Sequence, residues 1–220
     1  VLSGTPPRDL RVAYIEPGPT SPAAAVNLAR GARVLAIDGI DLVNTNVSAE
    51  IDRLNDALAP FAIGQSHSFT VQDPGGGPQR TVSMTSANVT STPVQNVRTI
   101  TTASGPVGYL LFNDHIATSE AGLVNAITTL RDAGIVDLVL DVRYNGGGFL
   151  DIASELAYMI AGNARTSGRN FELLQFNDQH TTRAPVTGET LAPLPFHPAA
   201  EGFSVTAGTP LPALNLGRVY

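Results

Sequence analysis

Short runs of apolar and β-branched residues separated by turn-forming residues mark the first part of the chain. Alternation within these runs favours strands, and Pro, Gly and Asp clusters between them favour turns. The segment Asp73–Pro78 is rich in glycine and separates two such runs as the tip of a hairpin. The pattern predicts strands at residues 10–15, 32–37, 40–43, 67–72 and 79–85.

Helical spacing is found twice in this part of the chain. An alanine-rich helix is expected at residues 22–28, behind Thr20, Ser21 and Pro22. A longer helix is expected at 48–58, where Ile51, Leu54 and Leu58 recur at helical spacing. In this reading Ser48 caps its amino terminus and Pro60 stops it.

The second half of the chain has longer elements in a different order. An apolar strand, an amphipathic helix and a buried strand follow one another, and this order predicts a parallel crossover unit. A further helix begins directly after a glycine triplet, and a last strand closes the chain. These elements are predicted at residues 108–113, 120–133, 135–142, 149–161 and 216–220.

Length and composition suggest two compact units. The chain has 220 residues with 43% hydrophobic content, enough for two small cores. Residues 88–102 mix Thr, Ser, Asn and Val with weak periodicity, which is typical of a connector or of edge strands. We therefore expect a first domain at 1–87, a linker at 88–106 and a second domain at 107–220.

Charge and residue usage exclude several classes of function. The net charge is −6 and only 15% of residues are charged, so no basic surface is available for nucleic acid or an anionic membrane. No apolar stretch is long enough to span a bilayer. Cysteine is absent, and the thirteen residues counted as Lys and Arg are all arginine. A thiolate nucleophile and a lysine general base are therefore excluded within the chain.

The motif Asp141–Gly148, DVRYNGGG, is the strongest chemical feature. Its glycines stand where a buried strand ends and a helix begins, and crevices at the carboxyl ends of parallel strands bind ligands. Glycine lets backbone N–H groups approach a reacting atom, so the turn suits an oxyanion hole or a phosphate cradle. A purely structural strand-to-helix turn explains the glycines equally well. Asp141 and Arg143 then support the turn.

The motif DVRYNGGG resembles the Asp-Leu-Arg-x-Asn-x-Gly-Gly segment of S41 peptidases, the tail-specific and carboxyl-terminal processing proteases. The strands at 107–112, 134–142 and 214–220 and the helix at 149–162 resemble this family in the same order. Upstream, EPG at 16–18 and RGARVLAIDG at 30–39 resemble the PDZ domain that such enzymes carry. The expected aspartate after Gly31 is replaced by Ala32, and no carboxylate-binding loop stands before Leu10.

The resemblance implies an α/β fold of ClpP/crotonase type for residues 107–220 and a PDZ-like β-domain with two helices, incomplete at its amino terminus, for residues 1–87. It implies a serine endopeptidase in which Gly147 and Gly148 form the oxyanion hole, supported by Asp141, Arg143 and Asn145. The catalytic serine and lysine would follow Tyr220, so the chain would be truncated before its nucleophile and inactive alone.

The resemblance also implies a partner, a groove and a location. The substrate would be a polypeptide bound near its carboxyl terminus by strand addition, with Ile51, Leu54 and Leu58 lining the groove. No metal or organic cofactor is expected, and the family resemblance places the protein in the bacterial periplasm or cell envelope. A catalytically inactive, PDZ-containing peptide-binding protein remains the alternative.

Histidines and serines add one candidate. The four histidines, His67, His115, His180 and His197, show no metal-ligand spacing and are interpreted mostly as surface or turn residues. His115 follows a strand and could face the same cleft as the glycines, where it is a candidate general base. No serine has the strand-to-helix setting of a nucleophile elbow.

Overall fold

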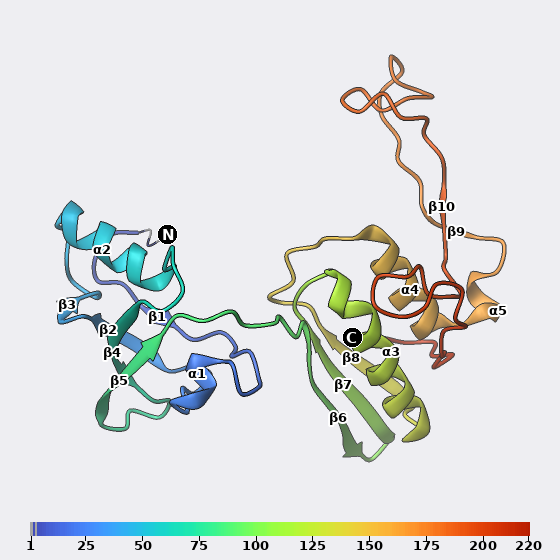
Figure 1. Cartoon of the computed structure of the whole chain (residues 1–220). Helices are drawn as coiled ribbons and strands as arrows, with labels where there is room; N and C mark the ends of the chain where they lie inside the picture. The colour runs from blue at the N-terminus through green and yellow to red at the C-terminus, as the bar shows by residue number, and fades with distance from the viewer. Residues whose placement is uncertain (1, 3) are drawn as a thin grey trace. The chain divides into compact units, whose positions relative to one another are not determined.

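The computed structural model describes residue 2 and residues 4–220 and separates the chain into two compact units, Val1–Ser91 and Thr92–Tyr220 (Figure 1). The division lies within the predicted linker, but the linker itself is different from the expectation. Residues Val94–Thr102 form strand β6, which pairs antiparallel with Gly105–Phe112, strand β7. Weak periodicity hid this strand because it lies at a sheet edge, where most of its side chains are exposed or half-buried.

The first unit is a small antiparallel sheet with two helices. Its strand order is β1-β2-β4-β5, with β3 also paired to β2, so β1 is an edge strand. The strands are β1 (Leu10–Arg11), β2 (Arg33–Ile37), β3 (Ile40–Asp41), β4 (Ser66–Gln72) and β5 (Gln79–Thr85), and the helices are α1 (Pro22–Ala25) and α2 (Ser48–Leu58). All the predicted elements of this unit are found, although β1, β3 and α1 are shorter than expected.

Helix α2 has the predicted bounds but not the predicted cap. Val47 is its N-cap residue, and Ser48 is already the first helical residue. No side chain of the described residues caps the helix; instead the Val47 carbonyl accepts from the N–H groups of Glu50 and Ile51. The Thr45 hydroxyl lies before the helix, where it accepts a hydrogen bond from the Val47 N–H and donates to the Glu50 carboxylate.

The second unit contains the predicted crossover. Strand β7 is followed by helix α3 (Ala117–Asp132) and strand β8 (Asp137–Asp141), and β7 and β8 pair in parallel. The sheet order is β6-β7-β8. The remaining elements are α4 (Leu150–Ala161), α5 (Asn163–Thr166), β9 (Asn170–Glu172) and β10 (Leu194–Pro195).

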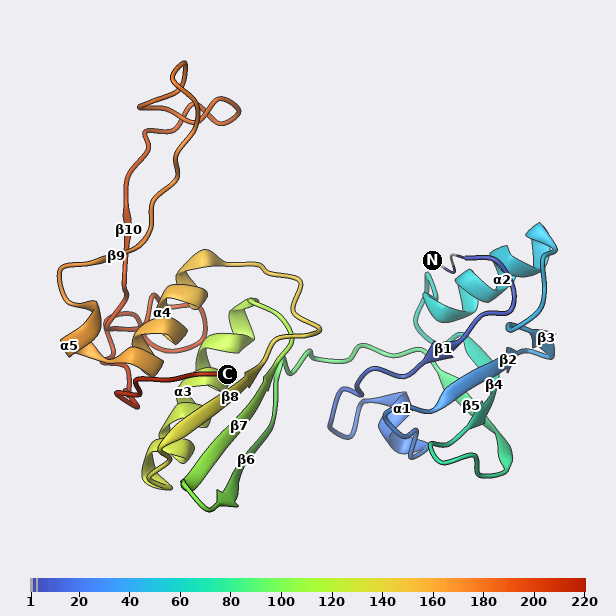
Figure 2. The same cartoon turned by 180° about the vertical axis from the view of Figure 1, so that it is seen from behind.

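One core joins the sheet of the second unit to α3 and α4. Leu123, Ile127 and Leu130 of α3 are fully buried, as are Ile152 and Met159 of α4. They belong to one cluster with the inward-facing residues of β7 and β8. Both views show α3 along the sheet, and a long excursion of the chain between β9 and β10 that leaves this core (Figures 1 and 2).

The end of the chain extends the sheet beyond β8. Val219 forms a parallel bridge with Leu138, the Tyr220 N–H donates to the Leu138 carbonyl at 2.8 Å, and the Leu140 N–H donates to the Tyr220 carbonyl at 2.8 Å. Arg218 fixes the register through two hydrogen bonds to Asp137, at 2.9 and 2.8 Å. The strand predicted at 216–220 is thus present only as an isolated bridge at Val219, which lies beside β8 and pairs with it in parallel.

Candidate active site

The glycine turn connects β8 to α4, as the motif predicts. Gly147 and Gly148 have φ angles of +96° and +129°, which side chains rarely adopt, whereas Gly146 does not have a positive φ. Phe149 is the N-cap residue of α4, so the helix begins directly after the glycines. Both candidate oxyanion glycines thus lie at the carboxyl end of a parallel strand.

Gly148 is required because another segment passes close to it. A Cβ atom at this position would lie 2.3 Å from the carbonyl oxygen of His115, which follows β7. The two segments are hydrogen-bonded, because the His115 N–H donates to the Gly147 carbonyl at 2.8 Å and the Phe149 N–H donates to the His115 carbonyl at 2.8 Å. The turn and the loop after β7 therefore form one backbone structure.

Asn145 organises the turn through its side chain. Its Oδ1 atom accepts hydrogen bonds from the Gly147 N–H at 2.8 Å and from Nδ1 of His115 at 2.9 Å, and its Nδ2 donates to the Phe112 carbonyl at 3.1 Å. The motif asparagine therefore joins the ends of β7 and β8. Its position in the motif was predicted, but two of its three partners, Phe112 and His115, come from a distant part of the sequence.

Only one of the two predicted oxyanion donors is available. The Gly147 N–H is already bonded to Asn145, because the side chain two residues earlier folds back onto it. Within the described part of the chain, the Gly148 N–H donates to no other residue. Of the two glycines that sequence offered as oxyanion donors, Gly148 is therefore the one whose N–H is not bonded to another described residue, and the oxyanion role itself stays a prediction.

His115 lies beside the glycine turn. Its Nδ1 is 3.2 Å from the Gly147 carbonyl, which can only accept, so Nδ1 carries a proton and donates to this carbonyl and to Asn145. The ring also packs on Phe112, with centroids 4.5 Å apart. His115 thus positions the turn through one nitrogen, and a role as general base stays a prediction that would involve Nε2.

Asp141 and Arg143 form the predicted support of the turn. The buried Asp141 carboxylate accepts from Arg143 Nε at 2.9 Å and Nη2 at 2.6 Å, from the Arg143 N–H at 3.2 Å and from the Tyr109 hydroxyl at 2.7 Å. The hydrogen bonds from Arg143 outweigh the effect of burial and hold the pKa of Asp141 far below its usual value. Tyr109 in turn lies under the Arg98 guanidinium, 4.0 Å from the ring centroid. Sequence reasoning missed Tyr109 and Arg98, which are distant from the motif.

Of the three residues predicted to line a peptide groove, the structure places only Leu58 at a groove, and peptide binding there stays a prediction. A groove of about 300 Å³ in the first unit contains Leu58 in its lining, but Leu54 is fully buried in the core and Ile51 does not line the groove. Leu54 and Leu58 lie about one turn apart on the same face of α2, but Leu58 is the last residue of the helix and is 40% exposed, so it reaches the rim of the groove while Leu54 stays in the core. The other lining residues are Leu10, Arg11, Val12, Leu28, Val34, Phe69, Val71 and Met84.

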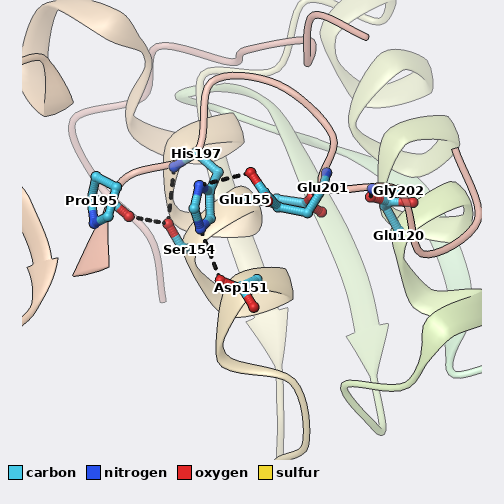
Figure 3. Close-up of polar contacts among 8 residues, drawn as sticks. All are labelled: Glu120, Asp151, Ser154, Glu155, Pro195, His197, Glu201 and Gly202. Carbon is cyan, nitrogen blue, oxygen red and sulfur yellow. Dashed lines mark hydrogen bonds and ion pairs between the residues drawn. The ribbon is translucent and has the colours of Figure 1, made fainter. Parts of the chain in front are cut away.

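One polar cluster of the second unit has no counterpart in the predictions. His197, interpreted from sequence as an ordinary loop residue, is largely buried between Asp151 and Glu201. Beside it, Glu120 and Glu155 are fully buried (Figure 3). Charged residues at inward positions of two amphipathic helices are the signal that could have revealed them. Over the residues with a described structure, no cluster of three or more metal-binding side chains is found.

The structure also bears on membrane association. None of the helices in the described ranges has the length and apolar character needed to cross a bilayer.

Comparisons with known proteins agree with this geometry. Residues 106–190 match the family model of Peptidase family S41, a range that contains β7, α3, β8, the glycine turn and α4. The chain is similar to a carboxyl-terminal-processing protease of Picosynechococcus sp., with 31% identity over 144 residues, which are 65% of this chain and 33% of the relative. The match thus spans about one third of the relative's length.

The fold is shared with a solved structure, described as a putative S41 protease from Bacteroides fragilis, at a TM-score of 0.65 and 24% identity. The alignment covers 100% of this chain and 53% of that protein. The mixed α/β architecture of both units is therefore that of a known fold. The chain is thus similar to peptidase family S41 over residues 106–190 and, in sequence, to a carboxyl-terminal-processing protease.

Proposed function

We propose that this chain is part of a serine endopeptidase of the carboxyl-terminal processing type, in which the DVRYNGGG turn supplies the oxyanion hole. The single observation that supports it most is the free Gly148 N–H at the carboxyl end of β8, next to the parallel segment that ends at Tyr220. Parallel strands present their carboxyl ends at one edge of a sheet. Whatever follows Tyr220 therefore emerges at the edge where Gly148 lies.

In this proposal a serine that follows residue 220 attacks the scissile amide, and a lysine removes its proton. The carbonyl oxygen gains negative charge as the tetrahedral intermediate forms, and the Gly148 N–H donates to it. The chain has no lysine, so the proposed base also belongs to the region after Tyr220. The collapse of the intermediate would release the amine part of the polypeptide and leave an acyl-enzyme for water to hydrolyse.

The surrounding residues would keep the donor in place. Asn145 holds the Gly147 N–H and thereby the direction of the next peptide unit, and His115 closes the turn from the other strand. Asp141 and Arg143 anchor the end of β8. A donor fixed before the reaction needs no reorganisation when charge develops, which is the main advantage of such a site.

We further propose that the first unit is a PDZ-like domain that captures the substrate near its carboxyl terminus. Edge strand β1 can accept an added strand, and Leu10 and Val12 at this edge also line the apolar groove, with Leu58 and Met84 on its other walls. An apolar side chain of the peptide would enter the groove. The second unit would be the core of ClpP/crotonase type.

The test uses the full-length protein that carries this chain. We expect it to degrade an unstructured polypeptide and to react with a fluorophosphonate probe at a serine after residue 220, located by mass spectrometry. The isolated 220-residue chain should do neither. Gly148→Pro deletes the donor and also forbids the positive φ of this position, so it should lower kcat by at least roughly 10²-fold. Amide exchange in the second unit checks that the variant is still folded.

The opposite outcome would be equally clear. Full-length protein that neither turns over substrate nor reacts with the probe, but still binds carboxyl-terminal peptides, would be a peptide-binding member of the family. A folded Gly148→Pro variant with unchanged kcat would remove the oxyanion role while leaving the peptidase assignment in place.

A further inference from the structure

Two glutamates of the second unit meet inside the protein. Glu120 belongs to the first turn of α3 and Glu155 to the middle of α4, and both have 0% exposed surface. Their carboxyl groups are in hydrogen-bonding contact with each other. Figure 3 shows both side chains directed toward the segment that carries Glu201 and Gly202. Two buried carboxyl groups in contact need a proton between them, because two adjacent carboxylates would repel.

Glu120 has the surroundings of an ionised carboxylate. It accepts hydrogen bonds from the backbone N–H groups of Gly202 at 3.0 Å, Ser204 at 2.5 Å and Val205 at 2.6 Å. Burial opposes ionisation, but these three donors outweigh it and keep the pKa of Glu120 below its usual value. The carboxylate thereby fastens residues 202–205 to α3.

Glu155 has the surroundings of a neutral carboxyl group. Its Oε1 accepts from the Glu201 N–H at 2.8 Å, whereas its Oε2 is sealed from solvent and finds no N–H or O–H donor among the described residues. Burial, together with the neighbouring Glu120 and Glu201 carboxylates, raises the pKa of Glu155 to about 7 against the opposing effect of the Glu201 N–H. A proton on Glu155 satisfies both groups, since it can be donated to Glu120.

The same segment has a second attachment at His197. Its Nε2 is 3.0 Å from Asp151 and its Nδ1 is 3.0 Å from Glu201, so both nitrogens donate only when the ring is protonated. The His197 N–H also donates to the Ser154 hydroxyl. The ionisable groups facing this junction are thus Glu120 from α3, Asp151 and Glu155 from α4, and His197 and Glu201 from the segment itself.

We propose that the proton shared by Glu155 and Glu120 is a latch that holds residues 197–205 against α3 and α4, and that loss of this proton as the pH rises releases the segment. The segment continues into the end of the chain, where the Leu214 N–H donates to Met159 and the Leu216 N–H to Ile160 before Val219 joins β8. The latch therefore controls how firmly the last strand is tied to the helices. It does not depend on the proposed peptidase activity.

The sign of the effect follows from linkage. Glu155 holds its proton more tightly in the closed state than when exposed, so closure is favoured at low pH and weakens as the pH rises toward 7. Above the pKa that Glu155 has in the closed state, the proton no longer stabilises closure. The opening equilibrium of the segment should therefore rise by roughly 40-fold between pH 5 and pH 7 and level off about one pH unit higher.

The experiment is NMR on the 220-residue chain. The ¹³Cδ shift of Glu155 should titrate with a midpoint near pH 7, and the exchange of the Gly202, Ser204 and Val205 amides, corrected for intrinsic rates, should report the opening. A midpoint below about pH 5.5, near that of an ordinary glutamate, would overturn the proposal. This titration needs only the wild-type chain, so it decides the question even if a variant fails to fold.

Two variants distinguish a pH dependence that comes from Glu155 from one that comes from His197. In Glu155→Gln the amide can still donate to Glu120 and accept from Glu201, so the rise in opening with pH should largely disappear. In His197→Gln the Glu155 dependence should remain. If Glu155→Gln keeps the wild-type pH dependence and His197→Gln loses it, the imidazole is the switch and the proposal is wrong.

Discussion

The groove of the first unit and the glycine turn of the second differ in what gives them their shape. Apolar side chains from β1, β4, β5 and α2 line the groove, so its form depends on side-chain volume. The turn depends instead on backbone atoms and on the absence of a side chain at Gly148. Volume can be exchanged gradually in a packed region, but a backbone contact of this kind tolerates no added atom.

This difference predicts how each region responds to substitution. Changes in the groove should have graded effects that follow burial. Changes in the turn should have effects that differ sharply between neighbouring positions. Each of the following experiments tests one side of this comparison, in order of decreasing expected effect.

Gly148→Ala should be the most damaging change, with a loss of about 4 kcal/mol in the unfolding free energy of the second unit. The added Cβ would lie 2.3 Å from the His115 carbonyl oxygen and the φ angle is +129°, so both a clash and backbone strain arise. Urea unfolding, monitored by a probe in the second unit, measures this loss in unfolding free energy.

Gly146→Ala is the matched control for this experiment. It meets no atom within 4 Å and has no positive φ, so it should change the unfolding free energy by less than about 0.5 kcal/mol. Equal effects at the two positions would show that the turn is not held by the His115 contact.

Leu54→Ala should lower the unfolding free energy of the first unit by about 3 kcal/mol, because the side chain is fully buried and leaves a cavity. Leu58→Ala, at a 40% exposed position, should cost less than about 1 kcal/mol. Only Leu58→Ala should weaken peptide binding at unchanged stability, measured by calorimetry with a carboxyl-terminal peptide. The reverse order of stability losses would mean that the helix is turned differently.

Asp141→Asn should cost the second unit about 2 kcal/mol at pH 7, since the charge-assisted bonds to Arg143 are weakened. The pKa of Asp141 is lowered in the folded state, so its contribution is present above the ordinary value of 3.8 and is lost as the pH falls below it. The wild type and the variant should therefore converge in stability in acid.

Asp132→Asn is the control for the acid experiment. Its ion pair with Arg131 is exposed to solvent, so the variant should follow the wild type at every pH within about 0.5 kcal/mol. A constant difference between Asp141→Asn and the wild type down to pH 2 would contradict the role of the Asp141 charge.

Local patterns in the sequence determined much of the fold. The bounds of α2, the buried face of α3 and the position of the glycine turn follow from periodicity, from turn residues and from the break between a buried strand and a helix. These features depend on residues close together in the chain. For the same reason the pattern of residues 88–102 left a connector and edge strands equally open, because an edge strand such as β6 is defined by its partner more than by its own pattern.

Only the tertiary structure decided which atoms meet. Asn145 reaches Phe112 and His115 across the sheet, and this contact uses the N–H of Gly147 and leaves that of Gly148 free. Glu120 and Glu155 are acidic residues on separate helices whose burial, and hence whose shared proton, depends on how α3, α4 and residues 201–205 pack. The sequence determines the local conformation at each of these residues, but hydrogen-bond partners and ionisation depend on the neighbours that folding brings within about 3 Å.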